Sequence, residues 1–340
     1  MATFLIGLVI LICGGALYGK FCENTFGPDD RETPAYSRQD GVDYVPMKTW
    51  RNSLINLLNI AGTGPIMGPI QGILFGPAAF LAIPIGNVIG GSMHDYFSGM
   101  ICTRDGGTQM PDFVKDYTNR TVYVLYDVFI CLLLLLVGAV FIYTPGDIAT
   151  TQIFKWSGAA AVTGVVCRDA LGSIGGTIAL IGVVVLPITS GDTALRALRL
   201  TLADSLHIRQ ENNKQRIALA APVFALVFVI LLWAKRDAEG FSRLWRYFAW
   251  SNQMISLFAL ACIAAWMFKS GKSKFVWVPL IPAAFYAFAT CSFIVHNPKQ
   301  LPGASVMSWT AAYIIAAVFT ICYLALCVVN GRKKAAQAKA

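Results

Sequence analysis

The sequence predicts an all-α protein that crosses a membrane several times, and three observations support this fold class. Hydrophobic residues make up 56% of the chain and charged residues only 13%, whereas about a quarter of the residues in a soluble domain are charged. The mean hydropathy is +0.60. A membrane span needs about 20 predominantly apolar residues. We therefore expect one transmembrane domain, residues 1–340, with about nine helices: 3–19, 53–75, 77–103, 121–144, 172–195, 217–234, 247–268, 276–295 and 308–330.

The first stretch, 3–19, is predicted to be a retained helix. It lacks the basic segment and the small-residue cleavage site of a signal peptide. The loop 20–51 that follows is rich in Gly, Pro and Asp, which favour turns over helix. Because loops of this length usually have a function, this one either caps the cytoplasmic mouth of a pathway or is a solvated connector.

The stretch 53–75 is predicted to be a broken helix. Three glycines and two prolines fall within residues 62–69, and each proline removes a hydrogen bond and leaves a carbonyl four residues earlier without its donor. A break inside a membrane is tolerated where it lines a cavity or packs on protein, and it often builds an ion or substrate site. The alternative is close helix packing through Gly64-x-x-x-Gly68. The candidate site residues here are Gly62, Thr63, Gly64 and Gly68.

The stretch 172–195 is predicted to contain a second break, at Pro187. Hydroxyl residues follow the proline, and Asp192 is the single acidic residue of the stretch. A charge at the centre of a membrane helix costs about 2.5–3.5 kcal/mol on insertion scales, so Asp192 is a functional candidate. The alternative is an interfacial ion pair with Arg196 or Arg199. The candidate site residues here are Thr189, Ser190, Asp192 and Thr193.

Two further polar groups lie in the third and seventh stretches. His94 and Asp95 are adjacent, and histidine titrates near neutral pH. The pair is therefore either a proton relay or a polar pair at the membrane interface near Arg104. Asn252 follows the aromatic run 245–250, which is typical of an interfacial belt. Asn252 either hydrogen-bonds across helices or contributes to the site.

The net charge of +9 is concentrated on alternate loops. Of the 27 Lys and Arg residues, 20 fall on one face and 7 on the other when the loops are counted in turn. The positive-inside rule places the richer face in the cytoplasm, with the N-terminus outside and the C-terminus inside. This distribution explains the charge without a nucleic-acid partner.

The sequence does not indicate an enzyme or a cofactor. The nine cysteines include no C-x-x-C pair, and the three histidines share no ligand spacing with them, so we expect no metal centre of these residues. Nor do the residues suggest a nucleophile with a base beside it. An enzymatic function is therefore the least favoured.

Five strings stand in order along the chain: Gly41–Pro46, Ala61–Ile66, Met93–Met100, Pro187–Ala194 and Trp245–Trp250. Together they resemble the carbon starvation protein A family. The resemblance implies a cytoplasmic-membrane transporter linked to peptide uptake during carbon starvation, and relatives of the family move pyruvate in symport with protons. The family is similar to the amino acid–polyamine–organocation transporters, which are built from inverted repeats.

The resemblance also implies an ion site. The stretch 53–75 matches the first, unwound core helix of those transporters, and 187–193 matches the eighth; the two helices form a cation site in sodium-coupled relatives. Typical family members have further helices, including a broken one, between the fourth and fifth spans of this chain. The segment 145–171, too polar for a clean span, lies where they are missing. The implied Na⁺ ligands are Gly62, Gly64, Thr189, Ser190 and Thr193.

The favoured function is a secondary transporter of small peptides or of a small carboxylate such as pyruvate, coupled to H⁺ or Na⁺. Its partners are the substrate, the coupling ion and the lipid bilayer. Because family helices are missing, a homo-oligomer is one way to complete the site. The alternative is a non-transporting membrane protein, either a sensor or assembly subunit or a truncated remnant, that retains half of the site.

Overall fold

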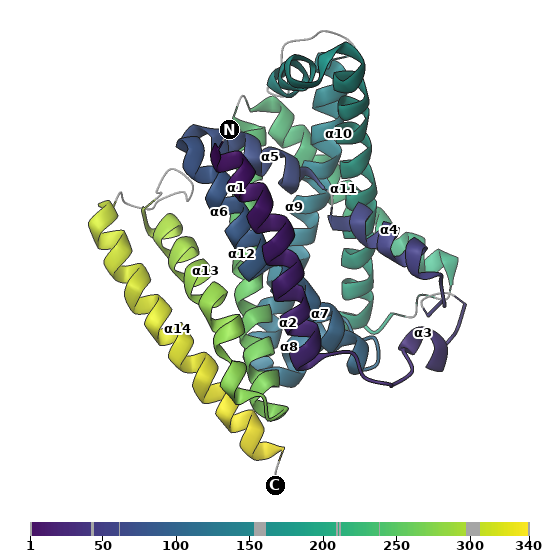
Figure 1. Ribbon diagram of the computed structural model, residues 1–340. Helices are drawn as coiled ribbons and strands as arrows, with labels where there is room; N and C mark the ends of the chain where they lie inside the picture. Colours follow the sequence, from purple (N-terminus) through teal and green to yellow (C-terminus); the bar gives the residue numbers. More distant parts are fainter. Residues whose placement is uncertain are drawn as a thin grey trace. The chain divides into compact units, whose positions relative to one another are not determined.

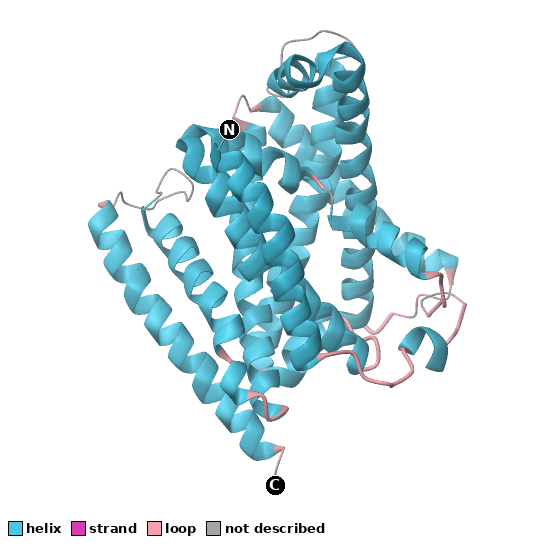
Figure 2. Ribbon diagram, viewed as in Figure 1, coloured by secondary structure: helices cyan, strands magenta, loops and turns pink. Residues whose placement is uncertain are grey.

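The computed structural model describes residues 2–41, 44–60, 62–152, 161–208, 210, 212–237, 239–296 and 307–338. Within these residues every regular element is a helix and no strand occurs (Figures 1 and 2). The predicted all-α fold class is confirmed.

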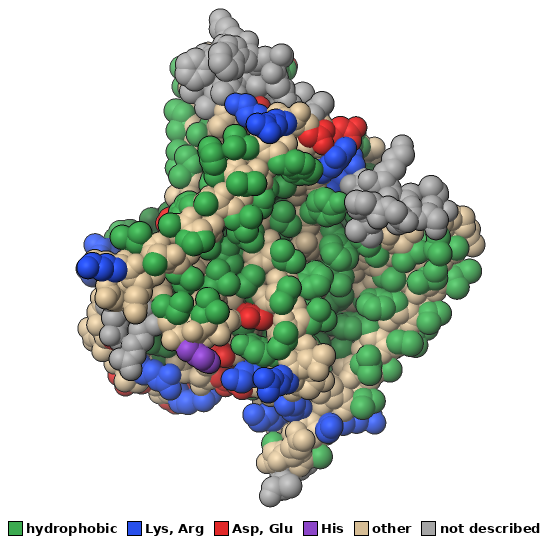
Figure 3. All heavy atoms as spheres, turned by 180° about the vertical axis from the view of Figure 1, so that it is seen from behind, with side chains coloured by type: hydrophobic (Ala, Val, Ile, Leu, Met, Phe, Trp, Pro, Cys, Tyr) green, Lys and Arg blue, Asp and Glu red, His purple; other side chains and the backbone are tan. Residues whose placement is uncertain are grey.

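Eight helices in the described residues are long and apolar enough to cross a membrane. Hydrophobic side chains cover much of the surface seen in Figure 3, as expected of helices that face lipid. The chain is therefore a multi-pass membrane protein. Of the nine predicted stretches, only 53–75 is not among the eight, because it is divided into two short helices. The eight are Ala2–Phe26, Leu74–Arg104, Arg120–Asp147, Leu171–Ser205, Asn213–Arg236, Gly240–Lys269, Ser273–His296 and Trp309–Gln337.

The chain forms two compact units. Unit 1 contains Met1–Pro46, Phe75–Phe129 and Trp250–Ala340, and unit 2 contains Met47–Leu74 and Ile130–Ala249. Two long helices, α9 (Arg120–Gln152) and α12 (Gly240–Lys269), begin in one unit and end in the other.

In unit 1 two long helices, each with a π-helical turn, run parallel and pack together. α1 packs on α6 and α2 packs on α7, and the two π turns contact each other. The backbones approach so closely that a Cβ on Gly7 would lie 2.1 Å from the carbonyl oxygen of Phe80. The elements are α1 (Ala2–Val9), η1 (Ile10–Gly14) and α2 (Gly15–Phe26) in the first helix, and α6 (Ala79–Gly86), η3 (Asn87–Gly91) and α7 (Ser92–Arg104) in the second.

The C-terminal part of unit 1 is a hairpin of α13 (Trp277–His296) and α14 (Trp309–Gln337), which lie side by side (Figure 1). A short helix, η4 (Ser273–Phe275), precedes α13, and α8 (Met110–Tyr117) follows α7. Several contacts join α14 to its neighbours, and three of them are specific to one residue each. Tyr323 donates to the Leu257 carbonyl at 2.6 Å, the Asn330 amide donates to the Tyr117 carbonyl at 2.9 Å, and Gly331 leaves room for a ring of α12.

Arg104 fixes the start of the predicted loop 20–51. α2 continues to Phe26, and the Arg104 guanidinium donates to the carbonyls of Phe26 and Gly27. It also forms an ion pair with Asp29 at 3.2 Å. The carbonyls at the end of α2, which lack partners within the helix, are satisfied in this way.

The later part of this loop packs on the turn between α7 and α8. It contains a short helix, α3 (Pro34–Ser37). Arg38 Nη1 and the Tyr44 hydroxyl donate to the Gly106 carbonyl at 2.9 and 3.3 Å. Residues 42 and 43 lie outside the described residues. The described part of the loop is thus a packed segment and not a free connector.

These contacts place the loop after α2 beside the turn after α7. Because of them, Pro46 leaves unit 1 at the end where Arg104 lies. Phe75 lies at the other end of the helix Leu74–Arg104. A crossing by 47–74, the second of the nine predicted stretches, stays a prediction.

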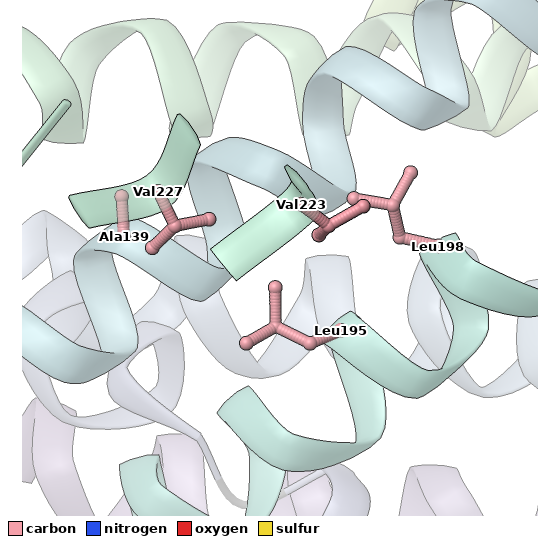
Figure 4. Close-up of a cluster of buried hydrophobic side chains, with 5 residues drawn as sticks. All are labelled: Ala139, Leu195, Leu198, Val223 and Val227. Carbon is pink, nitrogen blue, oxygen red and sulfur yellow. The ribbon is translucent and has the colours of Figure 1, made fainter. Parts of the chain in front are cut away.

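Unit 2 contains α4 (Thr49–Ile60), α5 (Thr63–Gly72), α10 (Ala161–Ser205), α11 (Asn213–Arg236) and most of α9. Close packing of α9 on α10 is possible because position 138 is glycine; a Cβ there would lie 2.6 Å from the Leu195 side chain. In a membrane such contacts stabilise the association of helices through van der Waals packing. The hydrophobic effect contributes little there, because lipid tails are as apolar as leucine. The buried cluster between α9, α10 and α11 is Ala139, Leu195, Leu198, Val223 and Val227 (Figure 4).

The predicted break in 53–75 is confirmed at Gly62, whereas the rest of the predicted segment, residues 63–69, is helical. α4 ends at Ile60, Gly62 lies in a turn and α5 begins at Thr63, whereas residue 61 lies outside the described residues. A short 3₁₀ segment, η2 (Ile73–Ala78), then connects α5 to α6 and turns at Gly76, whose φ is 69°.

The predicted break at 187–193 is wrong. α10 is helical through these residues, and its one non-helical position is Gly172, with φ 70°. Pro187 removes only one hydrogen bond from a long helix, so α10 continues through it. The helix is interrupted at Gly172 instead, because glycine readily adopts a positive φ. Of the segment 145–171, α9 takes residues up to Gln152 and α10 begins at Ala161; residues 153–160 lie outside the described residues.

Candidate functional site

The end of α4 presents carbonyl oxygens to α10. The last carbonyls of an α-helix have no donor within the helix. Here the Gly62 amide donates to the Ile60 carbonyl at 2.8 Å. Ser190 Oγ lies 3.2 Å from the Leu58 carbonyl oxygen and 3.4 Å from that of Asn59. The Ser190 hydroxyl therefore links the interrupted helix to α10.

Thr193, one turn further along α10, adds a second link. Its hydroxyl donates to Asn59 Oδ1 at 2.9 Å and lies 3.1 Å from the Thr189 carbonyl. The Thr189 hydroxyl donates instead to the Leu186 carbonyl at 2.8 Å, within α10. Ser190 and Thr193 thus contact α4 through their side chains, whereas Thr189 does not.

Of the three glycines of the predicted break, only Gly62 packs so closely on its neighbours that a side chain would not fit. A Cβ on Gly62 would lie 2.8 Å from the Phe141 ring and 3.4 Å from Ser190 Oγ. A Cβ on Gly64 or Gly68 would meet nothing within 4 Å. The alternative of close packing through Gly64-x-x-x-Gly68 is therefore not supported. The side chain of Thr63, a further predicted site residue, lies outside the described residues.

Buried aromatic rings adjoin this contact. Phe141 meets the Phe248 ring edge-on, with centroids 5.9 Å apart. The next ring, Trp245, donates from Nε1 to Gln71 Oε1 of α5 at 2.9 Å. Both Trp245 and Phe248 are buried. The interpretation of the run 245–250 as an interfacial belt is therefore wrong at these positions, because the rings pack inside unit 2 and hold α5 in place.

The oxygen atoms at the α4–α10 contact are all neutral. They comprise two backbone carbonyls, one side-chain amide oxygen and two hydroxyls, from Leu58, Asn59, Ser190 and Thr193. Carbonyl and hydroxyl oxygens at the end of a broken helix are ligands that suit Na⁺. The same atoms can hydrogen-bond a polar substrate.

Asp192 lies on an exposed part of α10. Within the described residues no ion pair joins it to Arg196 or Arg199. Arg199 donates instead to Gln210 Oε1 at 2.7 Å. The alternative reading of Asp192 as one partner of an Asp–Arg pair is therefore not supported.

The other three predicted site residues belong to unit 1. His94 Nδ1 lies 3.1 Å from Asp95 Oδ1, and His94 Nε2 is buried with no hydrogen-bond partner among the described residues. Asp95 precedes Arg104 by about 14 Å along α7, so the pair does not lie at that helix end. Asn252 is exposed on α12.

The geometry of unit 2, in which the helical segment 49–72 is interrupted and hydroxyl groups of α10 meet the end of α4, resembles the construction used by secondary transporters. A family model, described as carbon starvation protein CstA, matches residues 1–150 and 146–293. The chain belongs to this family.

Relatives share parts of the chain. An uncharacterized membrane protein of Haemophilus influenzae is 45% identical over 168 residues, which cover 48% of this chain and 45% of the relative. A second, uncharacterized protein of that organism is 41% identical over 129 residues, or 38% of this chain and 87% of the relative. The peptide transporter CstA of Bacillus subtilis is 36% identical over 112 residues, 32% of this chain and 19% of the relative. The chain thus spans less than half the length of the first relative. No solved structure matches.

Proposed function

We propose that the protein is a secondary transporter that moves small peptides, or a small carboxylate such as pyruvate, together with H⁺ or Na⁺. The observation that carries the proposal is the contact of Ser190 and Thr193 with the end of α4. The Bacillus subtilis relative is named a peptide transporter, which supports peptides as the substrate class. Membership of the carbon starvation family supports a role when carbon is scarce.

The neutral oxygens favour Na⁺ at the α4–α10 contact. A hydroxyl has one proton, so Ser190 can donate fully to only one of the Leu58 and Asn59 carbonyls at a time. A cation takes both carbonyls as ligands, and the hydroxyls of Ser190 and Thr193 then turn their lone pairs toward it. A proton-coupled mechanism would instead use the pair of His94 and Asp95, whose ring and carboxylate are in contact.

The proposal includes a second copy of the chain. The two segments matched by the family model meet at 146–150, inside the segment 145–171 where family helices are expected, and this supports a short form that lacks them. Asp192 is exposed near the middle of the span Leu171–Ser205. Because a carboxylate in lipid is costly, a protein surface that covers this face of α10 is expected.

The exposed apolar residues of α10 support the same conclusion. They recur at alternating spacings of three and four, the pattern of a seam between two helices. Oxidative cross-linking of Ile181→Cys within the membrane tests this contact, with Ile217→Cys on α11 as the control. The seam residues are Leu171, Ile174, Ile178, Ile181, Val185 and Ile188.

We also propose that the protein lies in the cytoplasmic membrane with its N-terminus outside and its C-terminus inside. The loop that contains Arg31 and Arg38, the turn after α7 and the end of α14 lie at one end of unit 1. Lys and Arg residues collect in these segments, and the positive-inside rule assigns such segments to the cytoplasm.

Uptake into proteoliposomes tests the transport function. Labelled dialanine and labelled pyruvate are offered to vesicles under a Na⁺ gradient, a proton gradient or neither. Accumulation that requires one of the gradients supports the proposal and identifies the ion. Correctly inserted protein that accumulates neither compound would favour the alternative, a non-transporting sensor or assembly subunit.

A further inference from the structure

A cavity of about 970 Å³ lies in unit 1 where α12 ends, α13 begins and α14 ends. Three cationic side chains line it: Lys269, Lys274 and Arg332. No acidic residue is among its lining residues. The cavity is therefore a concentration of positive charge without a neutralising group of its own.

The connection from α12 to α13 gives this cavity a defined shape. Gly271 adopts φ 72°, the Lys272 amide donates to the Met267 carbonyl at 2.8 Å, and the Gly271 amide donates to the Phe268 carbonyl at 3.4 Å. This is the Schellman arrangement, which satisfies the last carbonyls of a helix. The ammonium groups of the nearby lysines are therefore not required to cap α12.

The three cations make no ion pair within the described residues. Lys269 Nζ lies 5.2 Å from the centre of the Tyr117 ring, and Lys274 Nζ lies 5.1 Å from that of Phe275. Ring contacts of this kind leave the N–H groups able to donate to an anion. Arg332 is exposed at the end of α14.

A neighbouring cavity of about 400 Å³ shows the contrast. Lys269 lines both cavities, and in the smaller one it lies near Asp105. The other cations of the smaller cavity are engaged by the protein: Arg31 and Arg104 both pair with Asp29, at 2.6 and 3.2 Å, and Lys272 donates to the Thr25 carbonyl at 2.9 Å. The smaller cavity is thus a structural junction, whereas Lys274 and Arg332 of the larger one form no ion pair within the described residues.

The remaining wall of the larger cavity is apolar and continues to the lipid-facing surface. It is formed by Phe268, Val276 and Val328. Trp277, at the start of α13, is 47% exposed, as is typical of tryptophan at a membrane boundary. Leu326, two residues before Val328 on α14, is 67% exposed. A molecule in the cavity thus meets cations at one end and a surface for hydrocarbon at the other.

We propose that this cavity binds an anionic phospholipid, with its phosphate among Lys269, Lys274 and Arg332 and its acyl chains along Val328 and the outer side of α14. Basic pockets between membrane helices bind anionic headgroups because each nearby Lys or Arg adds to the attraction. The site is separate from the α4–α10 contact and does not depend on the proposed transport.

Lipid titration of the delipidated full-length chain, followed by native mass spectrometry, tests the proposal. We expect dioleoyl phosphatidylglycerol to bind about tenfold or more tightly than dioleoyl phosphatidylcholine. The variant K269Q/K274Q/R332Q should lose this preference. The matched variant K20Q/K235Q/K333Q removes as many charges outside the cavity and should keep it. Arg332→Gln alone, which breaks no ion pair in the described residues, should weaken the preference even if the triple variant does not fold.

Three results would overturn the proposal. The first is equal binding of the two lipids to the unmodified protein, and the second is an equal loss of phosphatidylglycerol from both triple variants. The third is displacement of phosphatidylglycerol by inorganic phosphate at comparable concentration, which would make the cavity a site for a soluble anion. Melting temperatures of all variants establish that the changes in binding are not caused by unfolding.

Discussion

Ser190 has two carbonyl oxygens within reach and one proton to donate. The carbonyls belong to Leu58 and Asn59 at the unpaired end of α4. Inside a membrane an acceptor left without a donor is costly because no water replaces the donor, so one hydroxyl shared between two carbonyls satisfies the site only in part. A bound cation would satisfy both, and the residues therefore favour binding before any transport step is considered.

Ser190→Ala should weaken ion binding. It removes one ligand, and we expect the Na⁺ concentration for half-maximal uptake to rise about tenfold, which corresponds to about 1.4 kcal/mol. Thr177→Ala is the matched control, since that hydroxyl is exposed on α10 and donates only to the Ser173 carbonyl. Equal effects of the two substitutions on the Na⁺ dependence would show that Ser190 is not a ligand.

Asp192→Asn should abolish uptake without preventing insertion. The amide keeps the shape of the side chain but removes the charge, and insertion of the span should become easier by up to about 2.5–3.5 kcal/mol. Uptake and the amount of inserted protein are measured on the same membranes. Normal uptake by a well-inserted variant would remove Asp192 from the mechanism.

Asp105 makes the stability of unit 1 depend on pH. Burial raises the pKa of its carboxyl above the usual 3.8, and Lys269 opposes this in part. The folded protein thus holds the proton more tightly than the unfolded chain, so the stability from this group is present below the unfolded pKa and is lost as pH rises through the folded one. Asp105→Asn should raise the melting temperature at pH 7, and the gain should shrink at pH 4. A decrease at pH 7 would mean that the Lys269 interaction outweighs burial.

The chain is interrupted before α5 but continuous through Pro187 of α10, because the prolines occupy different positions in the two helices. Pro65 is the third residue of α5, where the amide has no carbonyl to lose, so the interruption falls before it, at Gly62. Pro187 lies inside α10, and the intact turns on either side keep the helix continuous. Composition predicted the first interruption because several unfavourable residues fall together. The kink at Gly172 could not be located from the sequence, because Gly175 and Gly176 lie close by and glycine at any of these positions can adopt a positive φ.

The candidate site could be predicted only in part, because residue type and position do not show which side chains meet in the fold. Gly62, Ser190 and Thr193 were identified from residue type and position in their helices. Asn59 was missed because Asn52, Asn56 and Asn59 recur at helical spacings along an exposed helix. Its position just before the break was a signal that could have identified it. Phe141 was missed because a phenylalanine in an apolar helix carries no signal, and its role depends on which face of α9 meets the break.

Gly62→Ala should distort the junction of α4, α5 and α10. The new methyl group would lie 2.8 Å from the Phe141 ring, and overpacking of this kind typically costs about 1–3 kcal/mol. Gly68→Ala is the matched control, because a Cβ there meets nothing within 4 Å. We expect a lower melting temperature and reduced uptake for Gly62→Ala alone. Equal effects of both substitutions would mean that the contact with Phe141 does not set the cost.

For the whole molecule, the decisive question is whether α4 and α5 together cross the membrane. Taken separately, α4 and α5 have 12 and 10 residues, too few for a span of about 20. The contacts within unit 1 nevertheless place Pro46 and Phe75 at opposite ends of that unit. If this pair crosses, it makes nine crossings with the eight long helices of the described residues, an odd number, and the chain ends lie on opposite sides, as proposed above.

Short biotin-acceptor tags inserted after Asp30, after Glu239 and after Ala338 test this count, because a ligase confined to the cytoplasm labels only tags on its own side. With nine crossings, eight separate Asp30 from Ala338, so both tags should be labelled. Five crossings separate Asp30 from Glu239, so the tag after Glu239 should stay unlabelled.

If the segment 47–74 returned to the side from which it came, the tags at Asp30 and Ala338 would give opposite results. The broken helix could then not present its carbonyls at mid-membrane, and the ion site at Ser190 would fall with it. Labelling at Glu239 alone would keep the nine crossings and reverse the proposed orientation.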